Sequence, residues 1–412
     1  MPRGVDFALG ACSACVACGL VAAAAYAWIN RAASSSDSSF GADSSVAVGG
    51  SSFDRLVGST PLVRLAAVSA ACGAEVWAKL ELRNPGGSNK DRVVRALVDA
   101  AEANGFLIRG LPGTLVEGSS GSTALSLATI AAARGYKCLV ALPADAAADK
   151  RAALSRAGVT VIVAPAVGFT NADHYIHTAR RAAAALVARG ERALFLDQFG
   201  APGNAVAHEE GTGRELAAAV ARDGRGLAAF VCGAGTGGTF AGVGRALRAA
   251  GFAGTQLILA DPPGSVLAPL VTCGVAFAPQ QAERTMRRHR ADTIVEGIGA
   301  DRLTPTLQAA AMMADAVARV DDDETVATAR FLLRREGFFV GSSSAVNVAA
   351  AVKVARALRK AGAPESARVV TLLCDAGDRH ITKFWNEEVI TLWGLSDAAK
   401  NGETDLTMNF IR

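Results

Sequence analysis

The stretch Asn84-Pro85-Gly86-Gly87-Ser88-Asn89-Lys90-Asp91-Arg92 separates two segments of different periodicity. Residues 75–81 before it have the composition of a strand, and residues 93–101 after it carry an apolar face at helical spacing. The proline and the two glycines predict a turn whose serine or asparagine can cap the helix. Lys90 is therefore expected at a helix N-terminus, where the positive end of the dipole disfavours an ammonium and favours the free amine.

A free lysine amine can form a Schiff base with a carbonyl compound. The alternative is a solvated lysine in a turn, and the local sequence does not decide between the two. The stretch as a whole resembles the signature around the cofactor lysine of the cysteine synthase / cystathionine β-synthase family, and the resemblance runs from about Gly58 to about Trp385. It implies that Lys90 carries pyridoxal 5′-phosphate (PLP) in a fold-type II enzyme.

The composition indicates a large globular protein. The chain has 412 residues, of which 51% are hydrophobic and 19% are charged, with a net charge of +4. This is enough for one large or two medium domains. No basic stripe with interleaved aromatic residues occurs, so we expect no nucleic acid partner.

The eight cysteines do not form a disulfide framework, which is typical of a reducing compartment. Cys12, Cys15 and Cys18 have a spacing seen in iron–sulfur ligation, but they are embedded in apolar residues. Packing or acylation suits them better, and we expect no metal site.

The N-terminus is expected to be a membrane anchor. Residues 7–29 are almost entirely apolar, and as a helix of about 35 Å they would cross a bilayer core of about 30 Å. A cleaved signal peptide is the alternative. We assign residues 1–31 to the anchor and residues 32–52, which are rich in serine and glycine, to a flexible linker.

From residue 53 onward, strand-like and helix-like segments alternate, which predicts an α/β fold with parallel sheets covered by helices on both faces. The family resemblance implies two such domains with PLP in the cleft between them. We expect a smaller domain at about 84–205, a larger one at about 53–83 plus 206–395, and a C-terminal tail at 396–412. Predicted strands lie at 114–117, 137–142, 159–163, 193–196, 228–232, 256–260 and 368–373, and predicted helices at 122–134, 149–157, 171–189, 209–222, 239–250, 323–336 and 346–360.

The loop Glu117-Gly118-Ser119-Ser120-Gly121-Ser122-Thr123 follows a predicted strand and opens a helix, as anion-binding loops do. It resembles the substrate loop of the family, which implies that Ser119, Ser120, Gly121 and Thr123 hold the substrate carboxylate. Most of the family has an asparagine at the position of Ser122, where it hydrogen-bonds the ring hydroxyl of PLP. The shorter serine puts ring orientation, reaction specificity and rate in question.

A second anion loop, Gly233-Ala234-Gly235-Thr236-Gly237-Gly238-Thr239, also lies between a strand and a helix. With Asp261 after the next strand it satisfies the dinucleotide fingerprint. It also resembles the PLP phosphate cradle of the family, which implies that residues from Gly235 to Thr239 bind the phosphate. We favour the phosphate cradle because a dinucleotide leaves Lys90 and the serine loop without a role. The implied phosphate contacts are Gly235, Thr236, Gly237, Gly238 and Thr239.

Three further segments resemble family motifs. Gln198, in a partial match in which Ala201 replaces an asparagine, is implied as a carboxylate contact. Gly297 is implied to line the cofactor ring. Ser343, or alternatively Ser344, is implied to meet the pyridine nitrogen. A hydroxyl there weakens the electron sink, which favours β-elimination and β-replacement over transamination.

The expected function is PLP-dependent β-replacement on an O-activated serine, with Lys90 as the catalytic base, an amino acid as substrate and a sulfur nucleophile as the second substrate. Cysteine synthase is favoured. Cystathionine β-synthase or β-elimination, a catalytically weak tethered PLP-binding protein, and a dinucleotide enzyme remain alternatives. The resemblance further implies a homodimer and, through anchored eukaryotic relatives, attachment to the mitochondrial outer membrane with the catalytic region in the cytosol.

Overall fold

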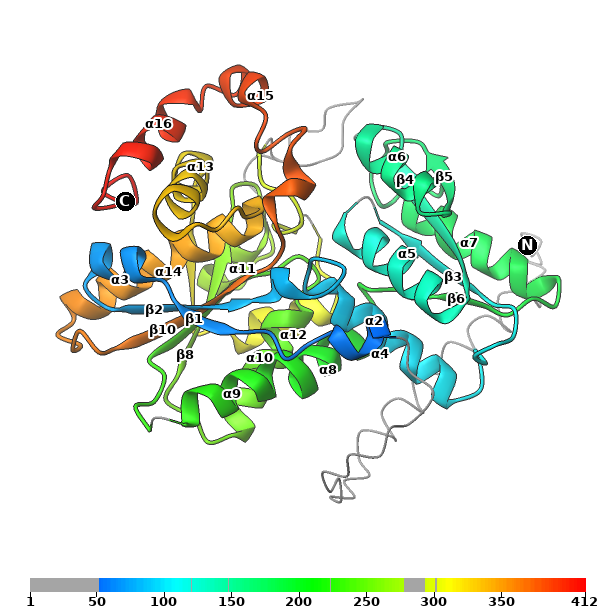
Figure 1. Cartoon of the computed structure of the whole chain (residues 1–412), viewed down its shortest axis with the longest axis horizontal. Coiled ribbons are helices and arrows are strands. Elements are labelled where there is room, and N and C mark those ends of the chain that lie inside the picture. Colours follow the sequence, from blue (N-terminus) through cyan, green and yellow to red (C-terminus); the bar gives the residue numbers. More distant parts are fainter. Residues whose placement is uncertain (1–51, 120, 147, 223, 278–292, 301) are drawn as a thin grey trace, which may run out of the picture. The chain divides into compact units, whose positions relative to one another are not determined.

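The computed structural model describes residues 52–119, 121–146, 148–222, 224–277, 293–300 and 302–412, which contain two sheets (Figure 1). The larger sheet has six strands in the order β1 (Leu62–Arg64), β2 (Glu75–Leu80), β10 (Arg368–Leu373), β7 (Ala229–Gly233), β8 (Gln256–Asp261) and β9 (Ala316–Arg319). The smaller sheet has four in the order β5 (Thr160–Ala164), β4 (Lys137–Pro143), β3 (Thr114–Gly118) and β6 (Ala193–Phe195). The predicted α/β class is confirmed.

Helices connect most of these strands. The α-helices are α2 (Ser52–Leu56), α3 (Ala66–Cys72), α4 (Lys90–Ala103), α5 (Ser122–Arg134), α6 (Ala148–Arg156), α7 (Tyr175–Ala188), α8 (Gly203–Ala207), α9 (Arg214–Ala221), α10 (Gly238–Ala249), α11 (Leu267–Cys273), α12 (Pro305–Met313), α13 (Asp322–Phe331), α14 (Ser342–Lys360), α15 (Glu387–Leu392) and α16 (Ser396–Thr404). Two π-helical turns, His208–Gly213 and Leu332–Glu336, extend α8 and α13, and 3₁₀ turns lie at Glu81–Arg83 and Gly377–His380.

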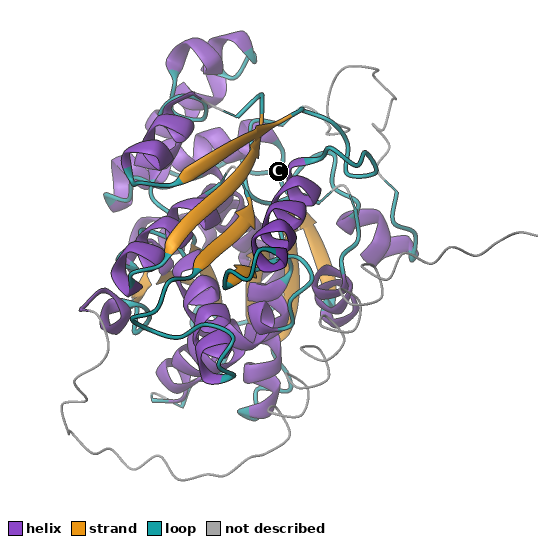
Figure 2. Cartoon of the chain, turned by 90° about the vertical axis from the view of Figure 1, so that its right-hand side faces the viewer, coloured by secondary structure: helices purple, strands orange, loops and turns teal. Residues whose placement is uncertain are grey.

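Alternate residues of the central strands point to opposite faces of the six-stranded sheet. On β10, Val369 and Leu373 belong to a core formed with α3 and α14, whereas Val370 and Leu372 belong to a core formed with α9, α10 and α12. Strands buried on both faces need apolar residues at every position, which explains their continuous hydrophobic runs. Figure 2 shows the strands enclosed by helices.

One edge of this sheet departs from the predicted parallel arrangement. β1 pairs antiparallel with β2, with Leu62 opposite Lys79 and Arg64 opposite Trp77. The short helix α3 reverses the chain between these two strands, so no parallel crossover forms. β1 has three residues and β9 has four, too few to show a strand period, and both were missed in the sequence.

The four-stranded sheet is parallel throughout and is also covered on both faces. Apolar residues of α4 and α5, such as Val94 and Leu127, pack on one face, and Ala179 and Ala183 of α7 pack on the other. All four strands lie inside the range expected for the smaller domain, 84–205, and the six strands of the larger sheet lie inside 53–83 and 206–395.

Three loops at the carboxyl ends of parallel strands carry the predicted motifs. β3 leads to α5, β7 leads to α10, and β10 leads to Cys374 and Asp375. Asp375 forms an isolated bridge with Ser88, two residues before Lys90. Ligand sites of parallel α/β sheets form at these carboxyl ends, so the fold brings the motifs to one region.

The residues assigned to a C-terminal tail, 396–412, pack against the rest of the fold. α16 lies on α13, Met408 and Ile411 are buried, and the Arg412 N–H donates to Glu324 Oε1 at 2.8 Å.

The predicted membrane anchor at 7–29 and nearly all of the linker at 32–52 lie outside the described residues. Among the helices that the structure does describe, none combines the length and the apolar character needed to cross a bilayer.

Candidate active site

Lys90 is the first residue of α4, as predicted, and its amine is tied to the glycine loop through one side chain. Lys90 Nζ donates to Asn89 Oδ1 at 3.0 Å, and Asn89 Nδ2 donates to Thr239 Oγ1 at 3.2 Å. Ser88, rather than Asn89, meets the helix end, because its Oγ accepts the Lys90 N–H at 3.3 Å. The buried Asn89 therefore joins the candidate Schiff-base lysine to the candidate phosphate loop.

The loop from Gly233 to Thr239 has the form of an anion cradle. Gly237 has a φ of 85°, and a Cβ there would lie 2.7 Å from the Leu307 Cα. In the described part of the chain, the N–H groups of Thr236, Gly237 and Thr239 find no protein acceptor, and α10 begins here without a side-chain cap. Unpaired N–H groups at a helix N-terminus favour a bound anion, and a phosphate monoester fits this donor set.

Side chains that the motif analysis missed hold the loop hydroxyls. Asn204 Nδ2 donates to Thr236 Oγ1 at 2.9 Å, and His208 Nε2 lies 3.1 Å from Thr239 Oγ1. Burial lowers the pKa of His208 well below its ordinary value, and the charge of Lys90 acts in the same direction. Asn204 lies three residues after Ala201, in the segment that matches the family in part, and this partial match was the available signal.

The serine loop opens α5, and two predicted substrate contacts meet there. Thr123 Oγ1 donates to Gln198 Oε1 at 2.7 Å although 75 positions separate them in sequence. Ser119 Oγ accepts the Gly121 N–H at 3.2 Å. Ser120 lies outside the described residues. This loop offers hydroxyls and a free helix N-terminus, as a carboxylate needs.

Three successive serines begin α14, and their partners differ. Ser342 Oγ accepts the Glu296 N–H at 2.9 Å, and Ser344 Oγ accepts the Cys374 N–H at 2.8 Å. Ser343 faces the Cys374 thiol, whose pKa burial raises to about 12. Since the other two hydroxyls serve the backbone, Ser343 is the serine available to a ligand.

Gly297 completes the site. Its φ of 84° is left-handed, and its carbonyl oxygen lies so close to Gly235 that a Cβ at Gly235 would overlap it. The two glycines therefore bring the segment around Gly297 and the loop from Gly233 to Thr239 into contact.

We predict that Gly235→Ala destabilises the fold by about 1–3 kcal/mol and weakens binding of the expected cofactor, PLP, at least about tenfold, because the methyl forces two backbone segments apart. Thermal unfolding and PLP titration measure both effects. Gly254→Ala is the matched control, since a Cβ there meets no atom within 4 Å. Equal behaviour of the two variants would contradict this account.

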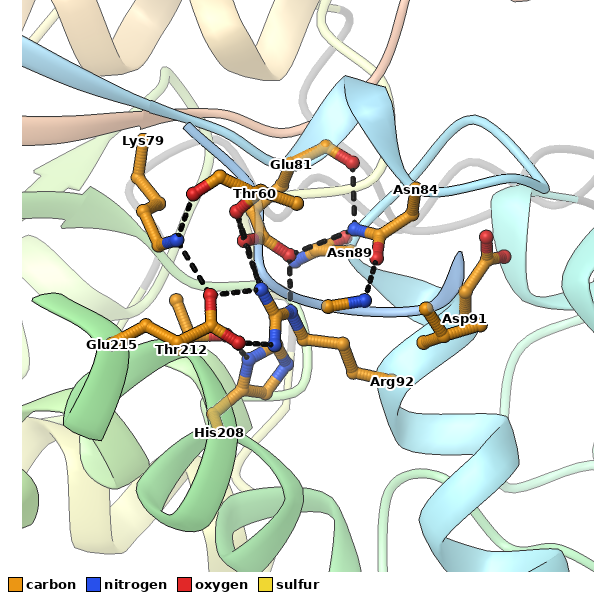
Figure 3. A network of polar contacts seen from close by, with 12 residues as sticks. Thr60, Lys79, Glu81, Asn84, Asn89, Asp91, Arg92, His208, Thr212 and Glu215 are labelled. Atoms are coloured by element: carbon orange, nitrogen blue, oxygen red, sulfur yellow. Dashed lines mark hydrogen bonds and ion pairs between the residues drawn. The ribbon is translucent and has the colours of Figure 1, made fainter. Parts of the chain in front are cut away.

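A buried network of charged side chains, which sequence analysis did not foresee, supports the start of α4 (Figure 3). Arg92 Nε and Nη2 donate to the two carboxylate oxygens of Glu81 at 2.7 and 2.9 Å, and Arg92 Nη1 donates to Glu215 Oε1 at 2.7 Å. Lys79 Nζ donates to Glu215 Oε2 at 2.6 Å. The network links β2, α4 and α9. Its central residue, Arg92, follows Lys90 by two positions in α4.

A second unforeseen group lies beside Ser122. Ser122 Oγ donates to Asp375 Oδ2 at 3.0 Å, and His380 Nε2 lies 3.1 Å from the same oxygen. His380 Nδ1 lies 3.0 Å from Glu296 Oε2. The segment from Cys374 to His380 follows the last predicted strand, and only the fold shows that it meets Ser122.

The contacts of His380 with Asp375 and Glu296 predict that the stability of the protein depends on pH. Burial alone would lower the pKa of His380, but Asp375 and Glu296 raise it from 6.5 to about 9. A raised pKa means that the contribution to stability is complete below about pH 6.5 and is lost as pH rises through about 9. We expect the difference in Tm between the native protein and His380→Gln to be largest near pH 6 and to disappear at alkaline pH. A difference independent of pH in this window would show that the imidazole is neutral.

Two α/β sheets, a lysine at the head of a helix and an adjoining loop of unpaired N–H groups are the arrangement expected of an enzyme whose cofactor is a phosphorylated carbonyl compound. Residues 53–375 match the family model described as "Pyridoxal-phosphate dependent enzyme". The chain belongs to this family, and its cofactor is PLP.

Comparison with individual proteins supports this family assignment. The chain is 43% identical over 334 residues to "Cysteine synthase 2" of Neurospora crassa, covering 80% of this chain and 72% of that protein. It is 39% identical over 336 residues to "Putative mitochondrial cysteine synthase" of Saccharomyces cerevisiae, covering 81% and 84%. Among solved structures, the "O-acetylserine dependent cystathionine beta-synthase" of Helicobacter pylori matches with a TM-score of 0.67 and 27% identity, covering 80% of this chain and 97% of that one.

The alternative of a dinucleotide-binding site requires Asp261 to bind a ribose, and the surroundings of Asp261 do not support this. Asp261 is buried, and its Oδ2 accepts the Ala268 N–H at 2.8 Å in the first turn of α11. Burial raises the pKa of Asp261 to about 6. A carboxylate enclosed in this way is a poor partner for a ribose.

No group of three histidine, cysteine or acidic side chains suited to a metal ion occurs among the residues with described positions. Cys12, Cys15 and Cys18 lie outside them.

Proposed function

We propose that this protein is a cysteine synthase, which replaces the leaving group of an O-activated serine, O-acetylserine being the favoured donor, with sulfide. The observation that carries the proposal is the contact chain from Lys90 through Asn89 to Thr239, which joins a Schiff-base lysine to a phosphate cradle. The fungal relatives at 39–43% identity are named as cysteine synthases, which supports the choice of reaction.

PLP, when bound through Lys90, supplies an electron sink for the negative charge that forms at the substrate Cα. The cofactor phosphate would be held by N–H groups and hydroxyls of the loop from Gly235 to Thr239. Ser343 would meet the ring nitrogen, Gly297 would line the ring, and Ser122 would lie toward the ring hydroxyl. The free donors of the loop and the available hydroxyl of Ser343 support this assignment.

Lys90 would act on the substrate as well as on the cofactor. Once the amino-acid substrate displaces it, its free amine removes the Cα proton as general base and returns a proton after sulfide has added. The amine stands next to the Asn89 amide oxygen, which orients it by accepting a hydrogen bond. Departure of acetate before entry of sulfide makes the order ping-pong.

The substrate carboxylate would bind at the head of α5. Ser119, Ser120, Gly121 and Thr123 would contact it together with Gln198. The Thr123–Gln198 hydrogen bond supports this assignment because it orients both side chains before substrate arrives. The loop would close over the carboxylate and exclude water during the reaction.

We further propose that residues 7–29 anchor the protein in the mitochondrial outer membrane, with the catalytic region in the cytosol, and that the enzyme is a homodimer. The apolar length of the segment and the name of the yeast relative support the first part. Carbonate extraction and protease protection of isolated mitochondria test it, and light scattering tests the dimer. Release of the protein by carbonate would contradict an anchor.

The test of the activity is the visible absorption spectrum of the full-length protein, followed by the assay of cysteine. We expect a yellow protein whose band changes on addition of O-acetylserine and returns on addition of sulfide, with cysteine formed. A band that O-acetylserine leaves unchanged would contradict the assignment. Formation of cystathionine from homocysteine in preference to cysteine would move it to cystathionine β-synthase, and a colourless protein that binds NAD would overturn the PLP site.

A further inference from the structure

Five polar side chains form a continuous chain from the head of α5 to α6. The Ser122 hydroxyl contacts Asp375, and His380 lies between Asp375 and Glu296, as described above. Lys150 Nζ then donates to Glu296 Oε1 at 3.1 Å. Ser122 and Lys150 belong to helices associated with the smaller sheet. Asp375, His380 and Glu296 lie in loops and turns associated with the larger sheet. This series of polar contacts therefore connects the parts of the fold built on the two sheets.

The protonation states along this chain follow from its charges. Burial alone would raise the pKa of Asp375, but the charge and hydrogen bond of His380 lower it below its ordinary value, and Arg379 acts in the same direction. Burial would likewise raise the pKa of Glu296, which His380, Lys150 and Lys383 bring down to about 2. Near neutral pH both carboxylates are therefore ionised and the imidazole between them is a cation.

An ionised Asp375 can only accept hydrogen bonds, so the contact with Ser122 requires the hydroxyl proton of Ser122. A serine has one such proton, and its remaining capacity is two acceptor lone pairs. In the present geometry Ser122 Oγ can therefore accept from a further group but cannot donate to it. An asparagine at this position, as the resemblance implies for most of the family, would instead offer amide N–H donors.

Asp375 is itself held in a fixed position. Its Oδ1 is buried and has no hydrogen-bond partner within the described part of the chain. A Cβ at Gly341 would overlap that oxygen, so glycine is needed where α14 begins. The positive end of the α14 dipole and the imidazolium of His380 together stabilise the carboxylate there.

We propose that Asp375 and His380 are positioning residues that hold Ser122 as a hydrogen-bond acceptor toward the ring hydroxyl of PLP, the reverse of the polarity that an asparagine would give. This inference rests on the proposed PLP site. An acceptor favours the protonated ring hydroxyl, so the bound cofactor should keep that proton to higher pH than it would with an asparagine at position 122.

The test is the absorption spectrum of the full-length, PLP-loaded protein as a function of pH, without substrate. Asp375→Ala removes the carboxylate acceptor and frees the Ser122 proton, so the midpoint of the spectral transition should fall by about one pH unit, the equivalent of one charged hydrogen bond. His380→Gln removes the cation that keeps the pKa of the buried Asp375 low, so Asp375 takes up a proton, no longer requires the Ser122 proton, and the midpoint should fall as well. Asp378→Asn, an exposed carboxylate in the same turn, is the matched control and should not move it.

A lower midpoint in both the Asp375 and the His380 variants is the result that a purely structural role would not produce, because loss of the His380 charge alone would raise the midpoint. A higher midpoint in the His380 variant, or no shift beyond the control in either variant, would overturn the inference and leave the PLP site intact. Absence of any cofactor band in the native protein would instead refute the proposed function. If Asp375→Ala does not fold, Ser122→Ala removes the acceptor toward the ring without a change of charge and should also lower the midpoint, and no shift in that variant would refute the inference.

Discussion

Replacement of Lys90 by alanine should remove the covalently held cofactor and lower the rate of β-replacement by at least about 10³-fold, because one side chain serves both as the attachment point and as the general base. Among the side chains described around Lys90, none can replace its amine. Its partner Asn89 is an amide, and Ser343 offers only a hydroxyl. Steady-state assays of cysteine formation measure the loss.

The attachment point can be identified directly. Reduction of the native protein with borohydride should fix PLP to the peptide that contains Lys90, and mass spectrometry of the digest should find it there. Lys137→Ala is a suitable control, since Lys137 is exposed at the start of β4. A label on another lysine, or full activity of Lys90→Ala, would remove the basis of the proposed mechanism.

Replacement of Arg92 by alanine should have the largest effect on stability, about 3–5 kcal/mol in the free energy of unfolding. Arg92 is 2% exposed and Glu81 is completely buried, so the variant leaves a carboxylate in the interior without its counter-charge. Burial would raise the pKa of Glu215, but Arg92 and Lys79 lower it to about 2, so a second carboxylate also loses a partner. Urea denaturation measures the loss.

Two variants test the cause of that loss. Arg214→Ala on α9 removes an exposed arginine that pairs with Glu210, and it should cost less than about 1 kcal/mol. Arg92→Lys keeps the charge but not the paired N–H donors that face Glu81, so its stability should lie between those of the native protein and Arg92→Ala. Equal losses for Arg92→Ala and Arg214→Ala would show that the buried pair adds nothing.

The long elements were predictable because their periods are local. Residues 122–134 and 368–373 were predicted as a helix and a strand, and α5 (Ser122–Arg134) and β10 (Arg368–Leu373) have these bounds. The helix predicted from residue 346 begins four residues earlier, at Ser342, because its first turn consists of serines that lack an apolar period. Short elements such as β1 and β9 are stabilised by neighbouring strands, and no local pattern announces them.

The candidate site was predictable only in part. Lys90, the glycine loop and the serine loop are contiguous motifs, and the roles proposed for them remain predictions. The choice between Ser343 and Ser344 needed their partners, because adjacent serines have the same chemistry until the backbone engages one of them. Asp375 and His380 contact Ser122 and Glu296, which are 253 and 84 residues away from them, so no local motif could indicate the role proposed for them.

By itself, the sequence determined the α/β class, the helix-head position of Lys90 and the glycine loop, since turns, helix starts and apolar periods depend on residues within a few positions of each other. The tertiary structure alone decided which buried charges meet and in what protonation state. That outcome depends on the distance between groups remote in sequence and on their removal from water, and neither quantity is encoded in a local pattern.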